Sequence, residues 1–226
     1  MATPRQQSVI ADVLAPSGVL NFLGQLHGEP ALLKKEVLVP RIGTPRFLRG
    51  RSIGRGFGGS ARRTVMFNSN AQRRQDTFEK QVTYQDESHF LGHLAQGENA
   101  EPLRIYFRSV RDGYRLYLRS GPRSGHALYL HNSGCVGAFK VVPGGAEPTV
   151  FQLLNANNQY VSPLHLLHDH VRVRLAVEGT KAPLRLRRYA HSPFTYLGCA
   201  GDGEPFDFSL HTVERNAPWL SQPDEV

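Results

Sequence analysis

A chain of 226 residues, 40% of them hydrophobic, is long enough for one domain with an extension or for two small domains, and it can bury a real core. No apolar run approaches the length of a membrane span, and the N-terminus lacks the basic region and unbroken apolar segment of a secretory signal. The sequence therefore predicts a cytoplasmic protein, or a component of an assembled particle, with no membrane span and no signal peptide.

The net charge of +8 is concentrated in one window. No acidic residue lies between Glu36 and Asp76, and residues 40–63 show no apolar periodicity. Arginines and glycines alternate there in "RFLRGRSIGRGFGGSARR". The arginines that are candidates for binding a partner or a polyanion are Arg41, Arg46, Arg49, Arg51, Arg55, Arg62 and Arg63.

Arginine offers a planar fork of donors that grips phosphate or carboxylate groups, and glycine leaves the backbone free to follow a surface. Segments of this kind bind nucleic acid by charge and stacking, but they usually repeat, and "GRGFGG" occurs once. We therefore predict an extended arm that contacts protein subunits, in a homo- or hetero-oligomer. Nucleic acid is the alternative partner.

The region before the arm has helix-like apolar spacing. Apolar residues recur at helical intervals in residues 9–14 and again in residues 20–26, and Pro16 and Gly18 separate the two stretches. We predict two short helices within residues 6–27. Together with the arm and a few short strands, they form an N-terminal extension over residues 1–102.

From Leu103 onward the sequence predicts β structure. The segment "LRIYFRSVRDGYRLYLRSG" alternates apolar residues with arginines on both sides of Asp112-Gly113, which is a strong hairpin signal. Short β-rich runs separated by turn residues continue to residue 213. The period-two alternation places the arginines of these strands on an outward face.

Three segments in this half, "YRLYLRS", "NQYVSP" and "FTYLGC", recur at intervals of about forty residues, and strands ending in "VFQLLN", "PLRLRR" and "FDFSLH" follow them. This pattern resembles the β-trefoil superfamily and its fascin-like branch. The resemblance implies a β-trefoil-like domain over residues 103–213 and a tail over residues 214–226. The fold class is therefore mainly β with a partly helical N-terminal region, and a β-sandwich is the alternative.

Two groups of residues are candidates for chemistry. Cys135 in "NSGCVGAF" is a candidate nucleophile, with His126 or His131 as a base, although a lone cysteine in a β protein is more often a packed side chain. The histidines of "HLLHDH", His165, His168 and His170, are candidate metal ligands, although no second cluster completes their site.

The arm and the β domain together predict a non-enzymatic binding protein that docks into a multi-subunit assembly and needs no cofactor. A phage virion or an injection apparatus is an assembly of this kind. A nucleic-acid-binding protein and a cysteine-dependent effector enzyme are the alternatives.

Overall fold

The computed structural model describes residues 3, 5–28, 30–40, 78–97, 101–111, 113–162, 170–180, 182–199 and 203–218. The chain forms two compact units: the barrel unit, Met1–Leu33 with Gln85–Val226, and the ribbon unit, Lys34–Tyr84. This division differs from the predicted one. Residues before 102 contribute strands to the same unit as those after it, so they are not a separate extension.

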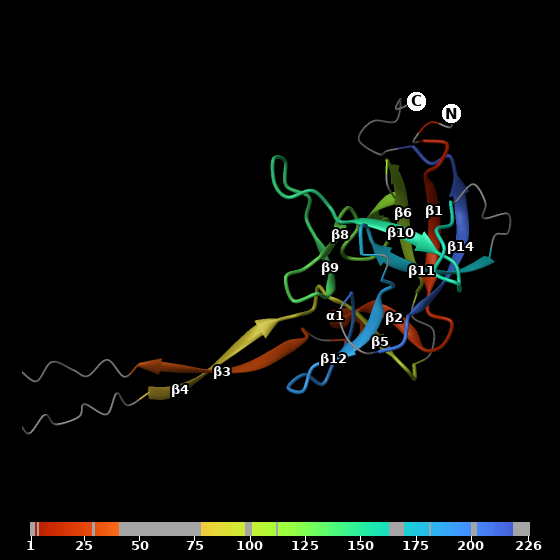
Figure 1. Ribbon diagram of the computed structural model, residues 1–226. Coiled ribbons are helices and arrows are strands. Elements are labelled where there is room, and N and C mark those ends of the chain that lie inside the picture. Colours follow the sequence, from red (N-terminus) through yellow and green to blue (C-terminus); the bar gives the residue numbers. More distant parts are fainter. Residues whose placement is uncertain are drawn as a thin grey trace, which may run out of the picture. The chain divides into compact units, whose positions relative to one another are not determined.

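Six strands of the barrel unit close on themselves (Figure 1). Around the barrel they are β1 (Val9–Leu14), β6 (Leu103–Val110), β7 (Gly113–Leu118), β10 (Val150–Leu154), β11 (His170–Val177) and β14 (Asp207–Arg215), each antiparallel to the next. The pairing of β7 with β10 closes the ring and leaves these strands without open edges. The mainly β prediction is confirmed, and the described strands of the barrel unit form a closed ring rather than the two open sheets of the β-sandwich alternative.

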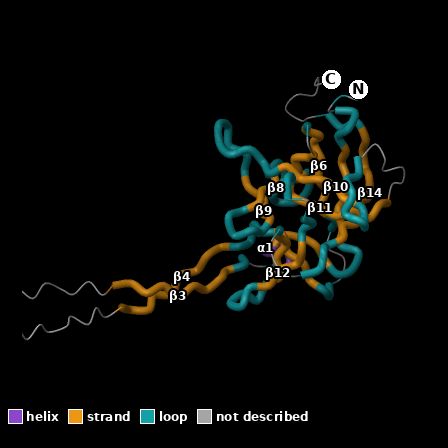
Figure 2. Tube along the Cα trace, in the orientation of Figure 1, coloured by secondary structure: helices purple, strands orange, loops and turns teal. Residues whose placement is uncertain are grey.

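Three hairpins alternate with the barrel strands along the chain. Figure 2 shows that strands and loops make up nearly all of the described chain. They are β2 (Val19–Phe22) with β5 (Leu91–Leu94), β8 (Ala127–Leu130) with β9 (Val136–Phe139), and β12 (Arg185–Arg188) with β13 (Thr195–Gly198). Each hairpin bridges the next through one backbone pair: Phe90 with Gly137, Cys135 with Gly198, and Tyr196 with Gly92. The order of barrel strand, hairpin and barrel strand therefore occurs three times.

The predicted helices of residues 6–27 are wrong. Residues 9–14 and 19–22 are strands β1 and β2, and only the single turn α1 (Leu23–Leu26) is helical. In β1 the buried side chains of Val9, Ala11 and Val13 alternate along the strand, which pairs with β6 on one side and β14 on the other. Short apolar runs carry no reliable period, and pairing on both sides decided the conformation.

Most of the predicted strand runs form, but "NQYVSP" does not become a strand, and the three related segments do not occupy equivalent positions. "YRLYL" lies in the barrel strand β7, whereas "TYLG" is the hairpin strand β13. Tyr160 makes only an isolated bridge with Leu154. The hairpin predicted around Asp112-Gly113 does form, as β6 with β7, and Val110 lies opposite Gly113.

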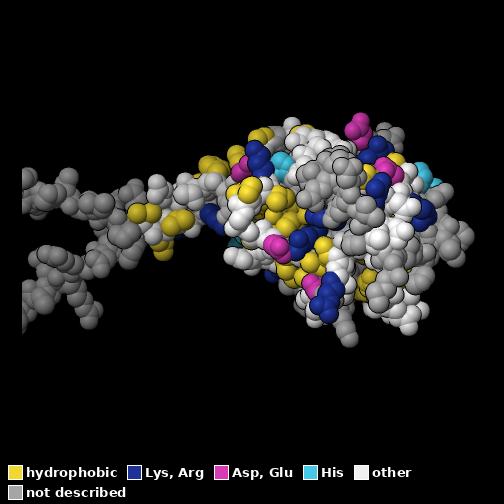
Figure 3. All heavy atoms as spheres, turned by 90° about the horizontal axis from the view of Figure 1, so that it is seen from above, with side chains coloured by type: hydrophobic (Ala, Val, Ile, Leu, Met, Phe, Trp, Pro, Cys, Tyr) yellow, Lys and Arg dark blue, Asp and Glu magenta, His cyan; other side chains and the backbone are white. Residues whose placement is uncertain are grey.

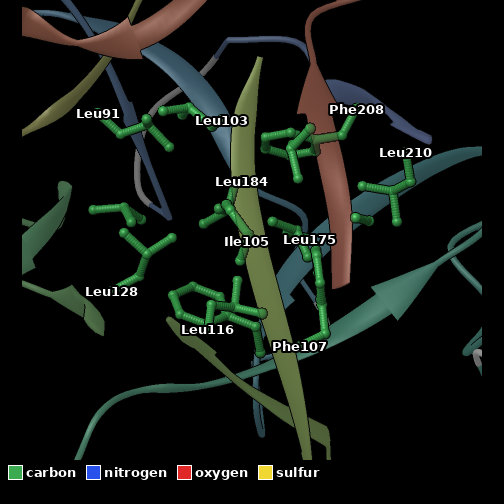
Figure 4. Close-up of a cluster of buried hydrophobic side chains, with 14 of the residues drawn as sticks. Leu91, Leu103, Ile105, Phe107, Leu116, Leu128, Leu175, Leu184, Phe208 and Leu210 are labelled. Carbon is green, nitrogen blue, oxygen red and sulfur yellow. The ribbon is translucent and has the colours of Figure 1, made fainter. Parts of the chain in front are cut away.

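The main core fills the barrel with side chains from every barrel strand. Figure 4 shows Ile105, Phe107, Leu116, Leu175 and Phe208 converging there. A second cluster lies among the hairpins and contains Leu23, Ala31, Phe90, Cys135, Phe194 and Tyr196. Three outward arginines of the strands meet carboxylates: Arg104 pairs with Asp12, Arg115 with Glu147, and Arg174 with Asp207.

The ribbon unit belongs to an insertion within the first hairpin. The chain leaves α1, runs through β3 (Leu32–Pro40), returns through β4 (Phe78–Asp86), and only then enters β5. The two strands pair as a two-stranded sheet. The Lys80 ammonium lies 3.1 Å from the Glu36 carboxylate, and the Thr83 hydroxyl donates to the Lys35 carbonyl.

Gly113 provides a test of barrel closure. A Cβ at this position would lie 2.4 Å from the Phe151 carbonyl oxygen, across the β7–β10 pairing. Gly113→Ala should therefore lower the free energy of unfolding by about 1–3 kcal/mol in urea titrations, the usual cost of overpacking. Exposed Arg111→Ala is the control, and its effect should stay within about 0.5 kcal/mol. Equal stability of the two variants would contradict the closure.

Candidate functional site

The ribbon unit exposes large apolar side chains. Val37, Leu38, Val82 and Tyr84 retain 44%, 62%, 42% and 66% of their accessible surface. Neighbouring residues of a strand point to opposite faces, so Val37 and Leu38 place apolar surface on both faces of the ribbon. Hydrophobic side chains are visible on its surface in Figure 3. We call these four side chains the apolar ribbon surface.

The arginine segment is joined to this ribbon by the sequence. Strand β3 ends at Pro40 and β4 begins at Phe78, so the connection between them carries the predicted arginines. All seven lie outside the described residues: Arg41, Arg46, Arg49, Arg51, Arg55, Arg62 and Arg63. One insertion therefore supplies both the apolar ribbon surface and the arginine-rich connection.

A buried polar network holds the two ends of the insertion together inside the barrel unit. The Glu87 N–H donates to the Ala31 carbonyl over 2.8 Å, so the departing and returning chain meet there. The Tyr196 hydroxyl donates to the buried Glu87 carboxylate, and the Ser192 hydroxyl lies 2.6 Å from the Tyr196 oxygen. Burial, followed by the hydrogen bond to Glu87, raises the pKa of Tyr196, which keeps the phenol protonated as a donor.

Cys135 is buried in the interior and is not exposed at the surface. Its side chain is 1% exposed and lies among Leu23, Phe90 and Tyr196 in the cluster between the hairpins. Its Sγ lies 3.1 Å from the hydroxyl oxygen of Tyr189, and that hydroxyl donates to the Ser133 carbonyl over 2.9 Å. The phenol has one proton, so the thiol is the donor between the two groups.

The surroundings of the thiol are those of a structural residue. Burial raises the pKa of Tyr189 to about 12, so the phenol is not a base near neutral pH. His131 lies near in sequence, but its Nδ1 is bound to the Ser133 hydroxyl at 3.0 Å and its ring packs against Phe90 and Phe139. The arrangement offers no activated nucleophile at Cys135.

The predicted metal ligands are only partly described. His165 and His168 lie outside the described residues. His170 is exposed at the start of β11 and stacks on His211 of β14, with 4.2 Å between the ring centroids. Within the described ranges, no group of three or more histidine, cysteine, aspartate or glutamate side chains could hold a metal ion.

The apolar ribbon surface was not predicted from the sequence, although the sequence contains a signal for it. "FEKQVTY" alternates apolar and polar residues, and "EVLVP" precedes the arginine segment, but nothing in either shows whether a second layer covers them.

Comparison of the chain with models of protein families, with curated proteins and with solved structures finds no match. Within the part of the chain that the structure describes, no helix is long and apolar enough to span a membrane.

Burial of Cys135 leads to a labelling prediction. A maleimide reagent should modify the partly exposed Cys199 first, because modification of Cys135 requires the structure to open. In a Cys199→Ala variant, the remaining thiol should react at least about tenfold more slowly than the same thiol in urea. Mass spectrometry of the labelled protein reads both rates. Rapid labelling of Cys135 in the native protein would restore it as a candidate nucleophile.

Proposed function

We propose that this chain is a non-enzymatic binding protein that docks into a multi-subunit protein assembly through its inserted ribbon. One observation carries the proposal: the ribbon unit exposes apolar side chains on both of its faces. The barrel unit, with its closed ring of strands, is the platform from which the insertion leaves and to which it returns.

The physical argument concerns what a two-stranded ribbon lacks. An isolated hairpin is marginally stable in water, because it needs further strands or a packed layer to bury one face. Val37, Leu38, Val82 and Tyr84 stay exposed, so within the described residues nothing supplies that layer. The open edges of such a ribbon also pair readily with another chain. A protein partner satisfies both requirements.

Protein is favoured over nucleic acid by the chemistry of the ribbon. Its described charged side chains have mixed signs, as in the pair of Lys80 with Glu36, and its exposed bulk is apolar. Nucleic-acid surfaces are instead basic and gain affinity from phosphate contacts. The nucleic-acid alternative rests on the arginine connection alone, and it predicts binding that weakens steeply as salt increases.

The enzyme alternative has little support from the barrel unit. Its one candidate, Cys135, is buried and bonded to Tyr189. A binding role, in contrast, does not require a buried side chain such as Cys135 to become exposed.

We further propose that the barrel unit is related to the β-trefoil superfamily. The support is topological: six barrel strands alternate with three hairpins that bridge one another in pairs. On this proposal the related region begins at β1 rather than at residue 103, and the ribbon is an insertion in the first of three similar parts.

The proposal is tested by the mass of the purified full chain in solution. The test uses a second copy of the chain as the partner, because a ribbon with open edges can pair with the same ribbon of another copy. Sedimentation should show an oligomer. The double variant Leu38→Ser/Tyr84→Ser should raise its dissociation constant at least about tenfold, because two large apolar side chains lose their burial.

Val142→Ser is the matched control, because Val142 is also 62% exposed but lies in the barrel unit. It should leave the mass unchanged, and urea unfolding should show that the barrel unit of each variant is intact. A wild-type chain that stays monomeric at every concentration, or equal effects of the control and the double variant, would refute docking through the ribbon.

A further inference from the structure

The barrel unit contains a hollow that neither the docking ribbon nor the core explains. Its volume is about 380 Å³, and four segments line it: α1, the turn before β5, the turn between β7 and β8, and the residue after β9. The side chains that carry the argument are Gln25, Ser88, Arg123, His126 and Lys140. We call it the Arg123 hollow.

Two cations of this hollow have no carboxylate in contact. On the barrel strands Arg104, Arg115 and Arg174 are each paired with a carboxylate, but among the described residues no ion pair forms at Arg123 or Lys140. The Arg123 guanidinium lies over the Phe22 ring, 5.7 Å from its centroid. A ring contact orients the guanidinium and leaves its N–H donors available for another acceptor.

One carboxylate lies nearby, and it is already satisfied. The Ser88 N–H donates to Asp86 over 2.8 Å, and the Ser88 hydroxyl donates to it as well, so these bonds hold the pKa of Asp86 below its usual value. The Ser88 oxygen also accepts the Ala31 N–H. Asp86 is close enough to feel the charge of Arg123, but the two cations of the hollow outnumber it.

The remaining polar groups are donors or can act as donors. Gln25 reaches the turn between β7 and β8, where a Cβ at Gly121 would lie 3.3 Å from its Nε2. His126 comes from the end of the same turn. His89 stands beside the hollow and stays neutral, because burial and then the charge of Arg123 lower its pKa.

We propose that the Arg123 hollow binds a tetrahedral oxyanion, a phosphate or sulfate group carried by a small molecule. Arg123 supplies a fork that matches two anion oxygens, Lys140 supplies a second charge, and Gln25 and His126 supply single N–H donors. The volume falls within the range of small-molecule pockets, so the hollow has room for more than the bare ion. This site is independent of the ribbon and of the proposed docking.

The test titrates the full chain with inorganic phosphate and, separately, with inorganic sulfate, followed by ¹H–¹⁵N NMR. The amides around Gln25, Arg123 and Lys140 should shift together and saturate. Arg123→Ala and Lys140→Ala should each weaken binding at least about tenfold, the equivalent of losing one charged donor. Arg188→Ala, a cation outside the hollow, is the matched control and should change the dissociation constant less than twofold.

Lys140 is exposed, so Lys140→Ala is expected to fold and keeps the test decisive even if Arg123→Ala does not. Titrations with glucose 6-phosphate and glucosamine 6-sulfate then distinguish a phosphate ligand from a sulfate ligand. The compound with the lower dissociation constant carries the group that the hollow binds. Shifts confined to residues 41–63, no saturation, or equal affinities for the Lys140 variant and the control would overturn the proposal, because each would indicate non-specific attraction to a basic chain.

Discussion

The fold depends on one contact, the pairing of β7 with β10, which turns a row of strands into a closed barrel. It requires a glycine at position 113, where the Phe151 carbonyl approaches too closely for a side chain. Closure removes the open edges of the barrel strands and encloses side chains such as Phe107 and Leu116 in one core. The hairpins then have a fixed base on which to bridge one another.

A closed barrel can carry an insertion at little cost to its own stability. The two ends of the insertion meet at Ala31 and Glu87, and the bond from Tyr196 to Glu87 connects this point to the third hairpin. Surface insertions whose ends are already close add little loop-closure entropy. The chain can therefore carry a ribbon and an arginine-rich connection while the hairpins and barrel stay intact. The two proposed sites divide along the same line: the apolar ribbon surface lies in the insertion, and the Arg123 hollow lies in the barrel unit.

Much of the β structure could be predicted, because strands such as β6 and β7 alternate apolar and polar residues around a turn. The place of each strand could not be predicted. The insertion makes the first of the three sequences of barrel strand, hairpin and barrel strand much longer than the other two. A search for a repeat in the sequence therefore finds related segments only after residue 103. It also matches strands that hold different positions in the fold, such as the barrel strand β7 and the hairpin strand β13. The same limit applies to the candidate site. The arginine segment could be found from its composition, whereas the exposure of Tyr84 depends on what packs against it and could not be predicted.

The sequence by itself determined the strand-rich composition, the hairpin after Leu103 and the position of the basic segment, because these depend on residue type and on near neighbours. Only the tertiary structure decided that residues 9–14 form a barrel strand, that Cys135 is buried against Tyr189, and that Arg123 and Lys140 line one hollow. Each of these depends on segments far apart in the chain, and the free energy that selects them comes from burial and pairing, which no local pattern contains.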